Sequence, residues 1–294
     1  MLRHSRRVPV RSLLVGVPVL FLVAFFLLPI GHMVAFSFQT FHPTKLVIPE
    51  FTLSNYAAIL TDPYITRILL RTIAISLATT ALCAVLAYPI AYRMRQAAGT
   101  EKMLLSLIVL TPLMISLIAL GYAWVLILAP NNGLVNTILR NLGLPTAKIM
   151  FTPTGIVVGL VYSNLVFMVL SLHAALENID ESLLRAARIL GANSVRVLLG
   201  VIFPLSLPGL VSGSLTVFSV SASSFVVPLL LGGRQVPVMA TYAYDMASFL
   251  NNWPSGSAIA VALFILAGAT NLVYSSWVHS IEKRLGILHE DQSA

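Results

Sequence analysis

The polar residues with the clearest spacing lie in the segment 177–209, ENIDESLLRAARILGANSVRVLLGVIFPLSLPG, between two strongly apolar stretches. Asp180 is placed to cap a helix, because its carboxylate can accept from the unpaired backbone N–H groups of a first turn. Glu181 and Arg185 stand at i and i+4, the spacing that lets opposite charges meet on one helix face. Gly191 predicts the end of this helix, because glycine adopts a left-handed φ without cost. These features predict a short helix and a tight turn that lie outside the bilayer.

A second, shorter helix is predicted after the glycine. Asn193 or Ser194 could cap it, and Pro204 is expected to end it. The alternative for the whole segment is an amphipathic loop that lies on lipid headgroups and binds no protein.

A stripe of small hydroxyls marks a later apolar stretch. It consists of Ser212, Thr216, Ser219 and Ser223. Their spacing of i, i+4, i+7 and i+11 places them on one helix face. The stripe either lines a polar passage or lets helices approach and hydrogen-bond across the interface. Ser221 and Ser224 fall off this face.

Four further side chains could contact a solute. Asn164 lies within an apolar stretch, where an amide needs a partner, either on another helix or in a pathway. Tyr242, Asp245 and Trp253 could bind a cation near the outer mouth, or the aromatic rings could anchor the chain at the membrane interface. The histidines are scattered without metal-ligand spacing, and no catalytic motif occurs. We therefore predict no metal site and no catalytic residue.

Composition identifies a polytopic membrane protein. Of the 294 residues, 58% are hydrophobic and only 10% are charged, against roughly 25% charged in soluble proteins. The net charge of +8 does not indicate nucleic-acid binding, because the basic residues mostly flank apolar helices. Twelve basic residues fall on the side of the N-terminus and six on the other, which predicts both termini in the cytoplasm.

The predicted fold is all-α, a single transmembrane domain over residues 1–294 with six helices. The expected spans are 12–38, 67–92, 103–129, 153–176, 205–231 and 255–278, with the polar loop at 177–204. Glycine pairs spaced by four residues in the fourth and fifth spans predict close helix packing. Outside the membrane, a short helix is expected over 136–142 and an amphipathic one over 239–250.

The polar loop resembles the signature of bacterial ABC importer permeases: Glu-Ala-Ala, three residues, Gly, nine residues, Ile-x-Leu-Pro. The matching positions are Ala186, Ala187, Gly191 and Pro204, with Val201 and Phe203 as conservative replacements. The resemblance implies a coupling helix that docks into a groove of the ATP-hydrolysing subunit, with Glu181, Arg185 and Ala192 as further candidates. Arg185 stands where the family usually has glutamate, and Glu181 lies one turn earlier.

Other stretches resemble the first membrane subunit of spermidine/putrescine-type permeases. They are Phe51-Thr52-Leu53-Ser54-Asn55-Tyr56, Tyr88-Pro89, Asn132-Gly133-Leu134-Val135-Asn136, Ile149-Met150-Phe151-Thr152-Pro153, Leu230-Leu231-Gly232-Gly233 and Asn252-Trp253-Pro254-Ser255-Gly256. This resemblance implies a type I importer fold, MetI-like, in the bacterial inner membrane. It also implies a second permease subunit, an ABC ATPase dimer and a periplasmic solute-binding protein as partners.

The sequence motifs agree with ATP binding by a separate subunit. The sequence contains no G-x-x-x-x-G-K-[ST] phosphate cradle, so ATP and Mg are expected on the partner ATPase, with no cofactor in this chain. An opine, a γ-amino acid or an aminophosphonate is the alternative to a polyamine substrate. An ion-coupled secondary carrier is a further alternative, although the polar loop would have no role in one.

Overall fold

The structure, a computed structural model, describes residue 16 and residues 18–285. The described chain forms two compact units. One contains the described part of Met1–Asp62 together with Ala243–Ala262, and the other contains Pro63–Tyr242 together with the described part of Leu263–Ala294. The regular elements of the described residues are helices and one small β-hairpin.

The first unit holds an apolar helix and a hairpin. Its elements are η1 (Val23–Leu27), α2 (Leu28–Ser37), β1 (Thr40–His42), β2 (Leu46–Ile48) and α3 (Ser54–Thr61), with the end of α13 and the start of α14. The strands are antiparallel, with Phe41 opposite Val47. Asn55 joins three segments, because its Nδ2 donates to the carbonyls of Ser37 (3.0 Å) and Gln39 (2.9 Å) and its Oδ1 accepts from Ser255 Oγ (3.3 Å).

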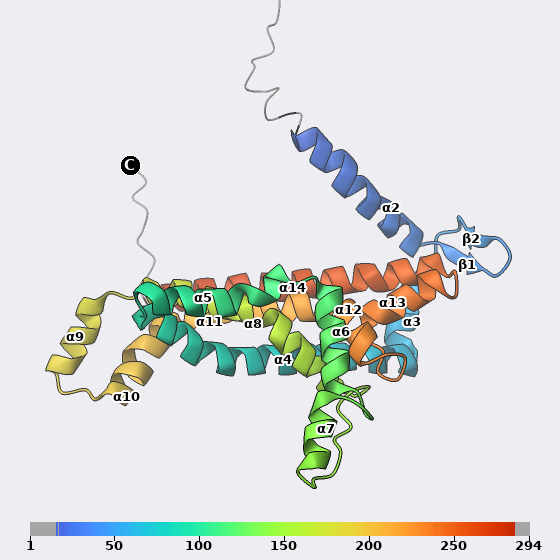
Figure 1. Cartoon of the computed structure of the whole chain (residues 1–294). Coiled ribbons are helices and arrows are strands. Elements are labelled where there is room, and N and C mark those ends of the chain that lie inside the picture. Colours follow the sequence, from blue (N-terminus) through green and yellow to red (C-terminus); the bar gives the residue numbers. More distant parts are fainter. Residues whose placement is uncertain (1–15, 17, 286–294) are drawn as a thin grey trace, which may run out of the picture. The chain divides into compact units, whose positions relative to one another are not determined.

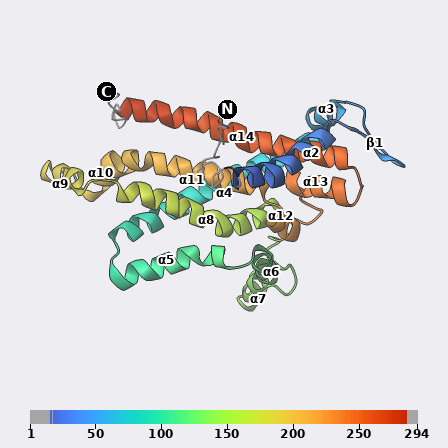
Figure 2. The same ribbon diagram turned by 90° about the horizontal axis from the view of Figure 1, so that it is seen from above.

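The second unit contains most of the helices. Its elements are α4 (Pro63–Gln96), α5 (Gly99–Met114), α6 (Leu117–Leu128), α7 (Leu134–Asn141), α8 (Pro153–Glu177), α9 (Glu181–Ile189), α10 (Ser194–Val197), η2 (Leu198–Ile202), α11 (Phe203–Ser223), α12 (Val226–Leu231), the start of α13 (Met239–Ser248) and the end of α14 (Trp253–Leu285). The helices α4, α8 and α11 lie side by side (Figures 1 and 2). Beyond one end of α8 and α11, α9 and α10 form a projecting corner (Figure 1).

Small residues allow α8 and α11 to approach closely. A Cβ added to Gly209 would lie 2.3 Å from Ala175 Cβ and 2.7 Å from the carbonyl oxygen of Ser171. A Cβ on Gly213 would lie 2.7 Å from Met168 Sδ. The glycine spacing in the fifth span therefore marks a helix–helix contact, as the sequence predicts.

Five described helices are long and apolar enough to cross a membrane, or six if one bent pair counts as a single span. The first of them runs over Pro18–Ser37, while residues 12–15 and residue 17 of the predicted first span lie outside the described residues. The bent pair is α5 and α6, which meet at an angle of 99°. The structure thus corrects the prediction of one uninterrupted helix over 103–129.

The break between α5 and α6 follows from local backbone chemistry. Pro112 has no backbone N–H and lies in the last turn of α5, so the helix loses a hydrogen bond there. Ile115 (ψ 136°) and Ser116 (ψ 132°) are then extended, and α6 begins at Leu117.

The fifth span also differs from the prediction. The helix α11 ends at Ser223, Ser224 is extended (ψ 131°), and the separate helix α12 covers the rest of the range predicted as 205–231. Pro228 explains this break, because in a continuous helix it could not donate to the carbonyl of Ser224. In the first turn of a new helix no such donor is required.

Pro204 does not end a helix, in contrast to the prediction from sequence. The chain passes from α10 through the π-helical turn η2 into α11, so Ser194–Ser223 is one helix and the polar loop is shorter than 177–204. Pro204 lies in the first turn of α11. A wide π turn directly before it accommodates the missing N–H, which is a recurrent use of such turns.

Candidate functional site

The corner between α9 and α10 is built around a glycine in the left-handed region. Gly191 has a φ of +83°. Its N–H donates to the carbonyl of Arg188 (3.0 Å), and the N–H of Ala192 donates to the carbonyl of Ala187 (3.1 Å). This pair of bonds is the Schellman motif, which satisfies the last carbonyls of a helix. The motif explains why glycine follows α9 at position 191, because the residue there has a left-handed φ.

Side chains cap both helices of the corner, as the sequence predicts. Asp180 accepts from the N–H of Ser182 (2.8 Å), and Asn193 accepts from the N–H of Arg196 (2.9 Å). The hydrogen bond from the backbone of Ser182 holds the pKa of the Asp180 carboxyl below its usual range.

The predicted contact between Glu181 and Arg185 is not formed. Among the ion pairs of the described chain, none joins these two exposed side chains. Arg185 instead acts on the Asp180 carboxylate, and its positive charge is a minor cause of the lowered pKa of that group. Ordering two long, solvated side chains for one exposed pair gains little free energy, which accounts for the missing contact.

The helix α9 has an inner and an outer face. Leu184 and Ala187 pack on the core cluster that contains Met94 and Leu176. On the outer face, Leu190 is 87% exposed. Three further residues of the outer face are also exposed: Leu183, Ala186 and Ile189. An exposed apolar surface on a short, doubly capped helix is typical of a protein–protein contact.

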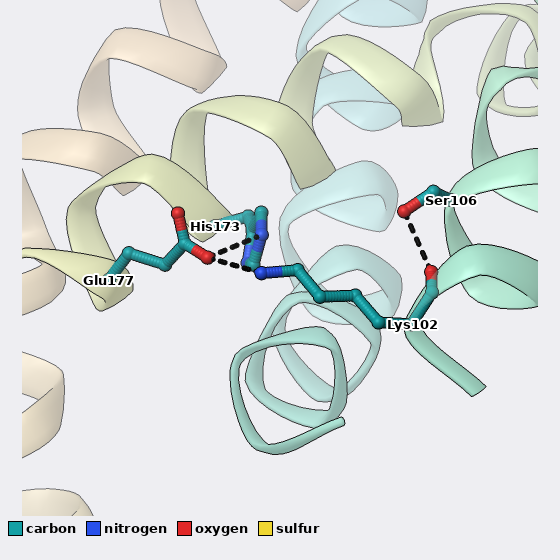
Figure 3. Close-up of polar contacts among 4 residues, drawn as sticks. All are labelled: Lys102, Ser106, His173 and Glu177. Carbon is teal, nitrogen blue, oxygen red and sulfur yellow. Dashed lines mark hydrogen bonds and ion pairs between the residues drawn. The ribbon is translucent and has the colours of Figure 1, made fainter. Parts of the chain in front are cut away.

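Polar contacts tie this corner to the helices around it. Arg95 at the end of α4 donates from Nη2 to the carbonyl of Ile179 (2.9 Å). Glu177 at the end of α8 accepts from Lys102 Nζ of α5 (2.7 Å) and lies 3.3 Å from His173 Nε2 (Figure 3). These contacts join α4 and α5 to the segment from which α9 begins.

The hydroxyl stripe of α11 lies on a face that the rest of the described chain leaves uncovered. Ser212, Thr216 and Ser223 are exposed, and Ser219 is partly buried. Thr216 Oγ1 donates to the carbonyl of Ser212 (3.1 Å), and Ser223 Oγ donates to that of Ser219 (2.9 Å). These hydroxyls thus bond within their own helix.

The amide of Asn164 forms the interhelical bond that its depth requires. The residue is 3% exposed, and its Nδ2 donates to Ser221 Oγ (2.9 Å), which joins α8 to α11. Ser221 falls off the stripe and is the hydroxyl of α11 that makes this contact. The Asn164 side chain therefore supports helix packing and does not lie on the exposed face.

A second stripe, on α4, is absent from the sequence prediction. It consists of Thr72, Ser76, Thr79 and Cys83, all buried. Thr72 Oγ1 accepts from the N–H of Met239 (2.9 Å) and donates to the carbonyl of Ile68 (2.8 Å). The same spacing of i, i+4, i+7 and i+11 was the signal that could have identified it.

The residues predicted at the outer mouth do not form one described site. Tyr242 belongs to the second unit and contacts Tyr64 edge-on, with 5.7 Å between ring centroids. Asp245 and Trp253 belong to the first unit, where Trp253 is 50% exposed.

Comparisons with known proteins agree with this architecture. The family described as "Binding-protein-dependent transport system inner membrane component" matches residues 101–287. The chain is 33% identical over 255 residues to the spermidine/putrescine transport system permease protein PotB of Salmonella typhimurium (strain SL1344), across 86% of this chain and 88% of that protein.

Two solved structures share the fold. One is a bacterial alginate ABC transporter in complex with an alginate pentasaccharide-bound periplasmic protein, with a TM-score of 0.74 at 16% identity over 94% of this chain and 96% of that one. The other is the inward-facing MetNI methionine ABC transporter, with a TM-score of 0.56 at 18% identity over 75% and 99% of the two chains. The fold is therefore that of type I ABC importer permeases, as the sequence predicts.

Proposed function

Because this chain belongs to the family of inner-membrane components of binding-protein-dependent transport systems, we propose that it carries a polyamine or a related small amine across the bacterial inner membrane. It is a multi-pass permease of an ABC importer and is not itself catalytic.

The observation that carries the coupling role is the exposed apolar face of α9. Leu183, Ile189 and Leu190 project from a helix that Asp180 caps at one end and Gly191 at the other. This face docks into the partner ATPase, which binds ATP and Mg. Ala186, Ala187 and Ala192 shape the turn, and Pro204 lies in the first turn of α11. Glu181 and Arg185 lie on the opposite side of α9.

The substrate assignment is supported by the 33% identity to a permease named for spermidine and putrescine. The exposed hydroxyls of Ser212, Thr216 and Ser223, with Ser219 beside them, supply acceptors that an ammonium group can use in place of water. Tyr242, Asp245 and Trp253 are the candidates for a first contact near the outer mouth, and Asn164 supports the helices behind the pathway. Another small solute, such as an opine, a γ-amino acid or an aminophosphonate, is the alternative.

The proposed assembly contains a second permease subunit, an ABC ATPase dimer and a periplasmic solute-binding protein. Both termini of this chain lie in the cytoplasm, because the basic residues concentrate on that side.

The decisive experiment measures substrate-dependent ATP hydrolysis by the purified complex in lipid nanodiscs. The binding protein is loaded in turn with spermidine, putrescine, amino acids and organic anions. Stimulation by a polyamine supports the proposal, and stimulation by another solute alone would reject the polyamine while retaining the importer. Absence of any ATPase that copurifies with the chain would reject the coupling role.

A variant of the turn tests the docking surface separately. Gly191→Val forces a β-branched residue to a φ of +83°, at a cost of about 1–3 kcal/mol. We expect substrate-stimulated ATP hydrolysis to fall about tenfold or more while membrane insertion persists. Gly200→Val is the matched control, because a Cβ there meets no atom within 4 Å. Normal stimulation in Gly191→Val would count against docking through this corner.

A further inference from the structure

A polar cavity of about 320 Å³ lies between the end of α4 and the side of α9 opposite Leu183 and Leu190. Its lining residues are Tyr92, Arg95, Gln96, Glu181, Leu184, Arg185, Arg188 and Ile202. The four from α9 are spaced as one helix face. The volume falls at the lower end of the range for small-ligand sites, which is roughly 300–1,000 Å³.

The lining carries an excess of positive charge. Three guanidinium groups, those of Arg95, Arg185 and Arg188, accompany the single carboxylate of Glu181. Among the described residues, no carboxylate lies within ion-pair distance of Arg185 or Arg188. These two arginines stand at i and i+3 on the same face, where like charges destabilise a helix. An anion in the cavity would relieve this repulsion.

Guanidinium groups from two different helices suit a phosphate. Arginine presents a planar set of N–H donors that matches phosphate oxygens in pairs. Arg95 uses Nη2 to hold the carbonyl of Ile179, which fixes its head group beside the cavity. Arg185 and Arg188 approach from α9. A bound phosphate would thus connect the end of α4 to the coupling corner.

The position of the cavity favours a lipid as the source of that phosphate. The helix α4 is apolar and long enough to cross a membrane, and Tyr92, Arg95 and Gln96 form its last turns. Tyrosine and arginine at the end of a membrane helix lie at the depth of the lipid headgroups. Leu184 and Ile202 add an apolar part to the lining, against which the glycerol region of a lipid could pack.

We propose that the cavity lined by Arg95, Arg185 and Arg188 binds the phosphate headgroup of an anionic phospholipid and thereby links the end of α4 to the inner side of the coupling helix. This inference goes beyond the proposed transport function. It assigns the charged face of α9 to the membrane and leaves the apolar face for the ATPase.

The test is lipid retention by the full-length chain in its complex with the partner subunits. The complex is taken from nanodiscs that contain phosphatidylglycerol and phosphatidylcholine into mild detergent, and native mass spectrometry identifies the retained lipid. We expect the wild type to retain phosphatidylglycerol selectively. Arg185→Gln and Arg188→Gln should each weaken retention about fivefold, the value expected for one basic residue near an anionic surface.

Matched variants separate a lost charge from lost folding. Arg196→Gln removes an exposed arginine of α10 that does not line the cavity, and it should retain phosphatidylglycerol as the wild type does. Arg188→Lys keeps the charge and should retain most of the lipid, even if the neutral variants assemble poorly. Equal loss in Arg196→Gln and Arg188→Gln would overturn the site.

Other results would overturn the lipid assignment. Equal retention of both lipids would show that the phosphatidylglycerol headgroup is not selected. Retention of inorganic phosphate without lipid would assign the site to the free anion. A second sample of the full-length chain is purified without the ATPase. Retention of lipid in that sample and its loss in the complete complex would mean that the ATPase occupies the cavity. Because no transported solute is added, none of these outcomes depends on the proposed substrate.

Discussion

Two helices of the larger unit carry the same pattern of small polar side chains, and the fold places them in opposite environments. Along α4, Thr72, Ser76, Thr79 and Cys83 are all buried. Along α11, Ser212, Thr216 and Ser223 are exposed and Ser219 is partly buried. Both stripes have the spacing i, i+4, i+7 and i+11, so periodicity alone does not distinguish them.

The difference between the stripes lies in what covers them. On α4, the Thr72 hydroxyl accepts a hydrogen bond from Met239, which lies 167 positions further along the chain. On α11, Thr216 and Ser223 donate to the carbonyls of Ser212 and Ser219 in the same helix. A pattern of hydroxyls therefore predicts a polar helix face. Whether that face packs against other helices or stays accessible to a solute or a partner depends on the segments that surround it.

The largest effect should follow from breaking the contact that holds α11 in place. In Gly209→Ala, the new Cβ would lie 2.3 Å from Ala175 Cβ and 2.7 Å from the carbonyl of Ser171. Since α11 must shift, we expect the free energy of unfolding to fall by about 3 kcal/mol. Thermal unfolding in detergent measures this change.

Gly200→Ala provides the control, because its Cβ would meet no atom within 4 Å. The free energy of unfolding of that variant should stay the same or rise by up to about 1 kcal/mol, because alanine lowers the conformational entropy of the unfolded chain. Equal stability of the two variants would mean that close approach of α8 and α11 is not required.

A matched pair of substitutions compares the stripes directly. Thr72→Val leaves the buried N–H of Met239 without its acceptor and should lower the free energy of unfolding by about 1–3 kcal/mol. Thr216→Val removes an exposed hydroxyl and should change it by less than about 0.5 kcal/mol. Chemical denaturation of both variants measures the difference. A comparable loss in Thr216→Val would assign the α11 stripe to packing.

Local features of the coupling corner could be predicted from sequence. The caps at Asp180 and Asn193 and the glycine turn depend on residues within a few positions of one another. The interhelical bond of Asn164 could also be expected, because an amide at depth requires a partner. Its partner Ser221 could not be selected, since that choice depends on the rotation of α11 against α8.

Breaks in the membrane helices were harder to predict. Proline is tolerated inside such helices, so Pro112 and Pro228 did not by themselves indicate where α5 or α11 ends. The π turn that accommodates Pro204 has no sequence signature of its own. The burial of the α4 stripe depends on segments distant in the sequence, and neighbouring residues give no information about them.

The bond between Asn164 and Ser221 offers a smaller test of the same comparison. A double-mutant cycle with Asn164→Leu and Ser221→Ala should give a coupling energy of about 0.6 kcal/mol, the mean for interhelical bonds in membranes. Pairing Asn164→Leu with Ser223→Ala supplies the control, because Ser223 bonds within α11 and should show no coupling. Equal coupling in both cycles would mean that the two faces of α11 are not distinct.

The smallest effect on stability is expected at the cap of α9. The acceptor there is the carboxylate of Asp180, whereas the stripes contain hydroxyls. The bond from the N–H of Ser182 lowers the pKa of Asp180 in the folded chain. The stabilisation is therefore complete above the ordinary aspartate pKa and is lost as the pH falls through the lowered folded value. Amide hydrogen exchange in the first turn of α9, corrected for its intrinsic pH dependence, should increase over that range. Asp180→Asn keeps a capping oxygen that does not titrate. In this variant the corrected amide exchange rate in the first turn of α9 should therefore not change with pH. An acid-induced increase in that variant as well would assign the change to another group.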